Sequence, residues 1–250
     1  HDRPFFLYLA ATIPHANNEA GDHGLEAPSD RPYSARDWPQ QQKNLAALVT
    51  RLDSDVGRIA AQLKALGIDR DTLIIFTSDN GPHREGGNDP DFFASSGPYR
   101  GIKRDLYEGG IRAPLIARWP GRIEPGSTSG HVSAFWDFLP TACEIARVQP
   151  PEDTDGISYL AELTGGSQPR HEYLYWEFHE GPASKQAVRL GNWKGIRLRP
   201  SGKVELYDLA SDIGETEYLA SGNPEVVRKI ERIMDSARSE STLWPLVDRT

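Results

Sequence analysis

The stretch Thr72-Leu-Ile-Ile-Phe-Thr-Ser-Asp-Asn-Gly81 decides the fold class of this 250-residue chain. It opens with a β-branched and aromatic run, which is typical of a buried parallel strand. Upstream, apolar residues recur at steps of three and four from about Gln41 to Leu66, and this period predicts a long amphipathic helix. A continuous apolar run, Phe5 to Ala11, predicts an interior strand before that helix. Strand, helix and strand in this order predict a βαβ crossover and an α/β fold.

The remaining segments change in character near residue 150. The run Ala113 to Trp119 predicts another strand, and Ser133 is the expected N-cap of a helix through Val148, with Pro140 kinking it. Beyond it, alternating residues predict a small antiparallel sheet, and Asn223 is the expected N-cap of a helix with Pro224 at its first position. We therefore divide the chain into an α/β part, 1–150, and a small α+β subdomain, 151–250. The four expected strands are 172–178, 186–190, 193–198 and 204–209.

Composition excludes several classes of function. Apolar residues at 38% and charged residues at 26% are typical of a globular protein. A formal net charge of −8 argues against a nucleic-acid partner. No stretch approaches the roughly 20 apolar residues that span a membrane. The chain starts without Met, almost directly on an apolar run, so we expect His1 to be a cut inside a longer, exported protein.

Candidate site residues follow the ends of the predicted strands. Asp79 and Asn80 come directly after one strand and offer oxygen donors to a hard cation, although Asp-Asn-Gly is also a common turn. His15 follows the other strand, and a histidine there can bind an anionic ester or protonate a leaving oxygen. Lys103 and its neighbours Arg100 and Arg104 are expected to form a cationic pocket for an anionic substrate. His83 lies close to the proposed metal loop. The alternative interpretation is that these four residues are solvated on the surface.

Four segments together resemble the type I, formylglycine-dependent sulfatases of the alkaline phosphatase superfamily. They are Phe5-Phe-Leu-Tyr-Leu-Ala-Ala-Thr-Ile-Pro-His15, Arg51-Leu-Asp-Ser-Asp-Val-Gly57, the stretch ending in Ser78-Asp79-Asn80-Gly81, and Arg100-Gly-Ile-Lys103 with Glu108-Gly-Gly-Ile-Arg112. The resemblance implies part of an alkaline-phosphatase-like sheet with flanking helices.

The resemblance also implies functional roles for individual residues. It makes Asp79 and Asn80 ligands of an active-site calcium, and it makes Lys103 and His15 catalytic groups on the sulfate ester. His83, Arg100 and Arg104 are expected to bind substrate.

The chain departs from the family pattern at the nucleophile. Family members carry Cys-x-Pro/Ala-x-Arg, whereas the single cysteine here lies in Cys143-Glu-Ile-Ala-Arg147, which is better interpreted as part of a packed helix. Two further metal-binding aspartates of the family are also absent. We therefore expect formylglycine and the rest of the calcium ligands on a missing N-terminal half, and no turnover by this chain alone.

Two alternatives and the substrate complete the sequence-based expectations. A phosphoesterase or phosphonate hydrolase of the same superfamily is one alternative, and a non-catalytic truncated sulfatase segment is the other. The resemblance suggests a sulfated saccharide as substrate, with Trp38, His83, Trp176 and His179 as potential sugar contacts.

Overall fold

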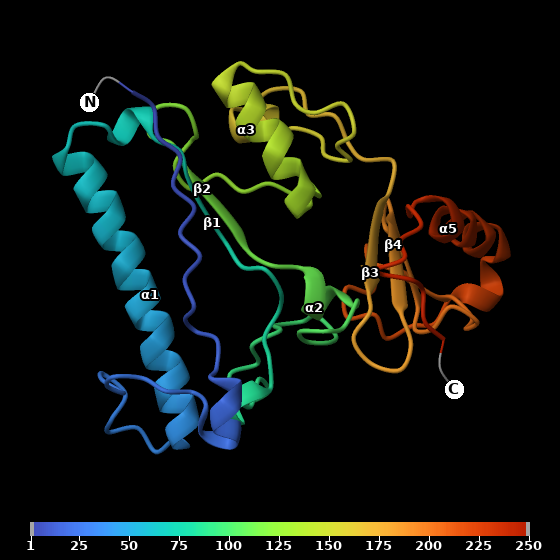
Figure 1. Ribbon diagram of the computed structural model, residues 1–250, viewed down its shortest axis with the longest axis horizontal. Helices are drawn as coiled ribbons and strands as arrows, with labels where there is room; N and C mark the ends of the chain where they lie inside the picture. Colours follow the sequence, from blue (N-terminus) through green and yellow to red (C-terminus); the bar gives the residue numbers. More distant parts are fainter. Residues whose placement is uncertain (1–2, 249–250) are drawn as a thin grey trace. The chain divides into compact units, whose positions relative to one another are not determined.

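The computed structural model describes residues 3–248 (Figure 1). They form two compact units. The first unit contains the described residues up to Asp69 together with Pro82–Ser95. The second contains Arg70–Gly81 and continues from Ser96 to the last described residue. The sequence-based boundary at residue 150 stays a prediction.

The first unit is built on the long helix α1 (Gln40–Ala65), which confirms the predicted amphipathic helix (Figure 1). The helix ends where Gly67 adopts a left-handed φ of 71°, a conformation that glycine accepts without strain. Its inner face contributes Leu48, which packs with Leu25 and Ala16 into a small core. Two short 3₁₀ helices complete the unit, η1 (Asn18–His23) and η3 (Glu85–Gly87).

The predicted strand at residues 5–11 is not formed. No described residue pairs with this segment in a ladder, and Phe5 to Leu9 are 58 to 80% exposed. An interior strand needs hydrogen-bond partners along both edges, and an apolar run does not create those partners by itself. The prediction of a βαβ crossover is therefore also wrong, because its first strand is absent. The second predicted strand, β1 (Ile74–Thr77), pairs antiparallel with β2 (Leu115–Arg118).

The second unit contains the four-stranded antiparallel sheet that the sequence predicted. Its strands follow one another in chain order, β3 (Leu174–Phe178), β4 (Lys185–Leu190), β5 (Trp193–Arg197) and β6 (Glu205–Asp208). Leu174 pairs with Arg189, and Leu190 pairs with Trp193. The unit also holds the short helices α2 (Glu108–Ile111), α4 (Leu160–Leu163), η2 (Asp69–Asp71, which begins at the last residue of the first unit) and η5 (Ala220–Gly222).

Helix α3 (Phe138–Ala146) begins later than predicted, after the 3₁₀ turn η4 (Phe135–Asp137). Ser133 is therefore not its N-cap. Asp137 holds the start instead, because its Oδ2 accepts the Ala134 N–H at 2.8 Å. Pro140 lies in the first turn, where its missing N–H costs no helical hydrogen bond, so the predicted kink is absent.

Helix α5 (Pro224–Ser236) packs on the sheet through its apolar face, beside β4 in Figure 1. Pro224 takes the first position and Asn223 the N-cap position, as predicted. The Asn223 side chain makes no capping hydrogen bond, since its Nδ2 donates to the Leu219 carbonyl. Ile230 sits directly over Gly195, where a Cβ would lie 2.6 Å from the Ile230 Cγ2. The buried core of this region comprises Val188, Val204, Leu206, Ile230, Ile233 and Met234.

No helix in the described part of the chain is long and apolar enough to cross a membrane.

We predict that Ile230→Ala lowers the free energy of unfolding by about 2–5 kcal/mol, because it leaves a cavity in this core. Urea denaturation measures the loss. Arg232→Ala, an exposed change on the same helix, serves as control and should stay within about 0.5 kcal/mol of the parent protein. Equal effects of the two substitutions would contradict the packing described here.

Candidate functional site

The turn that carries Asp79 and Asn80 leaves the end of β1. Ser78 Oγ donates to the Asn80 carbonyl at 3.1 Å, and Asn80 Nδ2 donates to the Gly81 carbonyl at 2.9 Å. The second bond commits the nitrogen end of the Asn80 amide to the protein, so the oxygen is the end left for a cation. Asp79 is exposed.

Three glycines join this turn to the loop that carries Lys103. Gly81 donates to the Gly110 carbonyl at 2.9 Å, and Gly109 donates to the Arg100 carbonyl at 2.7 Å. A Cβ on Gly81 would lie 1.8 Å from the Gly109 oxygen, and one on Gly109 would lie 2.3 Å from the Gly101 oxygen. The backbones therefore approach more closely than any side chain allows. The predicted metal turn, Asp79–Gly81, and the predicted sulfate-binding loop with Arg100 and Lys103 therefore both contact α2 (Glu108–Ile111) through the backbone.

A buried ionic cluster fixes α2 from the C-terminal sheet. Lys194 on β5 is fully buried, and its Nζ lies 2.7 Å from Glu108 Oε1 and 3.6 Å from Glu215 Oε1. Glu215 Oε2 accepts the backbone N–H of Glu108 at 2.7 Å. Arg189 on β4 contacts Glu108 Oε2 at 3.4 Å. Since isolated buried charges are costly, each member of this cluster needs the others.

The two carboxyl groups of the cluster respond differently to their surroundings. Burial works to raise the pKa of Glu108, but Lys194, Arg189 and Arg112 together hold it below its ordinary value. Burial raises the pKa of Glu215, and Lys194 offsets this rise only in part. Lys194 therefore pairs mainly with Glu108, while Glu215 serves as an acceptor for the first N–H of α2.

The predicted substrate-binding arginines have partners inside the second unit. The Arg100 guanidinium lies 3.9 Å from the centre of the Tyr107 ring and donates to the Tyr207 hydroxyl and to the Glu215 carbonyl. Arg104, with φ at 77°, pairs with Glu180 at 2.6 Å. Both therefore contribute to fixing the loop, and their roles toward a substrate stay predictions.

His15 and His83 lie together in the first unit. Their rings stack with centroids 5.4 Å apart, and His15 Nε2 lies 3.2 Å from Glu85 Oε2. Asn88 Nδ2 donates to the His83 carbonyl at 2.6 Å. The strand before His15 is not formed, so a shared sheet edge does not connect His15 with Asp79. That both residues act on one substrate stays a prediction.

The aromatic residues proposed for sugar contacts are packed in different ways. Trp38 packs edge-on against Phe92 and Phe93 in the first unit. Trp176 lies against the core of the second unit, with its ring 5.9 Å from Lys194 Nζ. His179 bonds to Ser184 Oγ and Glu177 Oε2, both at 3.0 Å.

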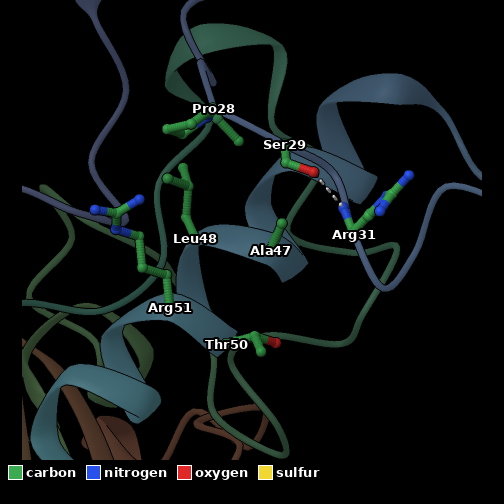
Figure 2. Close-up of a pocket in the computed structure, with 8 residues that line it drawn as sticks. Pro28, Ser29, Arg31, Ala47, Leu48, Thr50 and Arg51 are labelled. Atoms are coloured by element: carbon green, nitrogen blue, oxygen red, sulfur yellow. Dashed lines mark hydrogen bonds between the residues drawn. The ribbon is translucent and has the colours of Figure 1, made fainter. Parts of the chain in front are cut away.

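Two cavities among the described residues are lined by other side chains. One of about 230 Å³ lies between α1 and the preceding loop, and Figure 2 shows Arg31 and Arg51 at its edges. A second, of about 620 Å³, is lined by residues around α3, including Glu144 and Arg147. None of the predicted site residues lines either cavity.

Asp79 and Asn80 offer the kind of oxygen ligands that calcium prefers, but two residues are too few to complete its coordination. A carboxylate and an amide oxygen are ligands that hard cations prefer, but calcium takes about 6–8 oxygens. Within residues 3–248, no group of three or more His, Cys, Asp or Glu side chains is arranged to hold a metal. By themselves, Asp79 and Asn80 would supply two donor side chains, fewer than calcium needs, and their role as calcium ligands stays a prediction.

The sulfatase family pattern matches residues 1–148, and the pattern of the N-sulphoglucosamine sulphohydrolase C-terminal region matches residues 101–240. The chain belongs to the sulfatase family, within the alkaline phosphatase superfamily.

Individual relatives agree with this assignment. The chain is 28% identical to the N-acetylgalactosamine-6-O-sulfatase of Bacteroides thetaiotaomicron over 95% of its own length and 48% of that enzyme. It is 31% identical to arylsulfatase A of Homo sapiens over 93% of its length and 48% of that protein. Among solved structures, Ps i-CgsB superposes with a TM-score of 0.81 at 26% identity, covering 94% of this chain and 50% of that one. The chain thus spans about half the length of these relatives.

Sequence reasoning missed the residues that support the site. Glu108 was visible as part of Glu-Gly-Gly, but Lys194 and Glu215 gave no signal because they lie 86 and 107 positions from their Glu108 contacts. Glu85 lies two residues after His83 in the sequence, but its contact with His15 joins residues 70 positions apart, so no local pattern in the sequence indicated it.

We predict that Gly81→Ala lowers the free energy of unfolding by about 1–3 kcal/mol, because the added methyl cannot fit against the Gly109 carbonyl. Thermal denaturation measures the effect. Gly57→Ala is a control within α1, where a Cβ meets no atom within 4 Å; it should be neutral or stabilise by about 0.5–1 kcal/mol. Losses of the same size would refute a special role for the Gly81 contact.

We predict that Lys194→Met destabilises the protein by about 3–5 kcal/mol near neutral pH, since two buried carboxyl groups lose their cation. The deficit should narrow as the pH falls, because protonation neutralises these groups in the variant. Lys185→Met is the control: Lys185 lies on the neighbouring strand β4, its side chain is 26% exposed, and it pairs with Asp105. Loss of this partly exposed ion pair should cost no more than about 1 kcal/mol. A deficit for Lys194→Met that is independent of pH would contradict the electrostatic explanation.

Proposed function

We propose that this chain supplies the cation-binding and sulfate-binding part of a sulfatase that hydrolyses sulfate esters of saccharides. The observation that carries the proposal is the glycine contact of Gly81 with Gly109 and Gly110, which holds the Asp79–Asn80 turn and the Lys103 loop on one short helix. An oxygen-donor pair and an ammonium group on adjoining loops suit an anionic ester and its cation.

The names of the relatives support a saccharide substrate. One relative is an N-acetylgalactosamine-6-O-sulfatase, and it matches 95% of this chain. A solved structure of BT4656, with a TM-score of 0.65 and 26% identity, holds its substrate D-glucosamine-2-N,6-O-disulfate. The Ps i-CgsB protein has been solved in complex with a neocarrahexaose. These ligands share a sugar ring, so we assign the same substrate class here.

The proposed roles follow from the chemistry of each side chain. Lys103 binds the anionic sulfate group through its ammonium. His15 binds the same group or gives a proton to the sugar oxygen when the sulfur–oxygen bond breaks and the oxygen keeps the electron pair. Asp79 and Asn80 would hold calcium together with oxygen ligands from outside these 250 residues. Overall, water adds to the ester and yields the sugar alcohol, sulfate and a proton.

The nucleophile of the reaction is assigned to polypeptide outside these residues. Cys143 is the single cysteine of the chain, and it lies half-buried in α3. Its carbonyl accepts the Val148 N–H at the C-terminal end of that helix. Cys143 thus lies within α3, and Arg147 is the left-handed C-cap of that helix. We therefore assign Cys143 a structural role and expect the formylglycine elsewhere.

The test measures sulfate release by the native polypeptide that carries these residues. Saccharide sulfates, a generic aryl sulfate and the matching phosphate ester serve as substrates. We expect hydrolysis of the sulfate esters, and we expect Lys103→Ala to lower kcat/KM by about 100-fold to 1,000-fold. Lys229→Ala, an exposed change on α5, should leave kcat/KM unchanged.

Two results would overturn the proposal. Faster hydrolysis of the phosphate ester would favour a phosphoesterase. Turnover by residues 1–250 alone that survives Cys143→Ala would require a different catalytic apparatus.

A further inference from the structure

His15 has one ring nitrogen whose proton is fixed by the backbone. Nδ1 lies 2.7 Å from the Ala16 carbonyl oxygen. A carbonyl oxygen only accepts hydrogen bonds, so Nδ1 carries a hydrogen and donates it. The other nitrogen, Nε2, therefore determines whether the ring is neutral or positively charged.

Nε2 faces a carboxylate. It lies 3.2 Å from Glu85 Oε2, and the Glu85 side chain is 17% exposed. An unprotonated Nε2 at this distance would direct its lone pair at an oxygen lone pair, which is repulsive. A proton between the two atoms makes the contact a charge-assisted hydrogen bond. His15 is then protonated on both nitrogens and Glu85 is its counterion.

His83 contributes to the same cluster without sharing that charge. The backbone N–H of Glu85 donates to His83 Nδ1 at 3.1 Å, so this nitrogen is an acceptor and carries no hydrogen. Its separation of 3.9 Å from Glu85 Oε2 is therefore a proximity and not an ion pair. The neutral His83 ring stacks on the His15 ring at an interplanar angle of 28°.

The backbone fixes Glu85 relative to His15. Gly86, with φ at 66°, packs so closely on the His15 loop that a Cβ there would lie 2.5 Å from the Ala16 Cβ. Leu25 donates to the Gly86 carbonyl at 3.3 Å, and Gly24 accepts the Asn17 N–H at 2.8 Å. The carboxylate is thus presented to His15 by two interlocked loops and not by a flexible surface side chain.

We propose that Glu85 is a positioning residue whose carboxylate orients the His15 ring and keeps it doubly protonated, so that His15 meets the sulfate ester as a cation. The functional part of this inference rests on the proposed sulfatase activity. Among the described residues, the Glu85 carboxylate and the stacked His83 ring are titratable groups that lie against the His15 ring. A cationic His15 both attracts the anionic group and holds the proton that the leaving oxygen requires.

The experiment compares Glu85→Gln, Glu85→Asp and Glu26→Gln in the native polypeptide. Glu85→Gln keeps the size of the side chain and removes its charge. Glu85→Asp keeps the charge. Glu26→Gln removes a carboxylate from the same unit that bonds to Asn17 at 3.4 Å, and serves as the matched control. ¹⁵N NMR of the histidine rings reports directly whether Nε2 of His15 carries a hydrogen, and dispersion of the amide spectrum reports folding.

We expect both ring nitrogens of His15 to be protonated near neutral pH in the parent protein and in Glu26→Gln. Nε2 should lose its hydrogen in Glu85→Gln and regain it at least in part in Glu85→Asp. In the kinetic assay, the alkaline limb of kcat/KM should move to lower pH in Glu85→Gln, because the protonated ring loses its counterion.

An unchanged Nε2 signal in a folded Glu85→Gln protein would overturn the proposal, as would an unshifted alkaline limb. The NMR readout does not require turnover. A parent protein that hydrolyses no sulfate ester would refute the proposed function, and the NMR comparison would still decide whether Glu85 controls His15.

Discussion

Lys194 carries the one charge on which the arrangement of the second unit depends. Its ammonium group is fully buried beneath α2, within reach of Glu108 from that helix and of Glu215 from the loop after β6. Removing charged groups from water is expensive, and this cost is offset only while Lys194 stays in contact with its carboxyl partners. The cluster therefore ties three distant segments to one geometry. A neutral core would hold these segments with less directional control.

That control reaches the candidate site through backbone contacts. Glu108 begins the helix whose next two residues, Gly109 and Gly110, receive the Asp79–Gly81 turn and the Arg100–Gly101 loop. Side chains at these positions would separate the segments, so the close approach depends on glycine as much as on charge. The C-terminal sheet thus acts as a support for the loops that carry Asp79, Asn80 and Lys103. The sulfatase pattern and the C-terminal pattern both cover residues 101–148, which include Lys103 and α2.

The first unit organises its histidines by a different principle. Its loops meet over Gly24 and Gly86, and its small core is formed by Leu25, Leu48 and Ala16. Here the charged contact, between His15 and Glu85, is partly exposed to solvent, since 41% of the His15 side chain is accessible. A partly exposed ion pair contributes little to folding stability. Its significance lies in the protonation state and the orientation that it gives to one ring.

The sequence by itself determined the elements whose residues carry their own local signal. The period of the apolar positions defined α1, Pro224 and the apolar spacing after it defined α5, and alternation defined the four strands of the C-terminal sheet. Resemblance to the family motifs supplied the candidate site residues, including Asp79, Asn80 and Lys103. Tertiary structure decided the rest, because pairing partners and buried counterions are contributed by segments far apart in the chain. The apolar run at residues 5–11 forms no strand without a partner, β1 pairs with an antiparallel neighbour that periodicity cannot identify, and Lys194 becomes a structural cation only once folding buries it against two carboxyl groups.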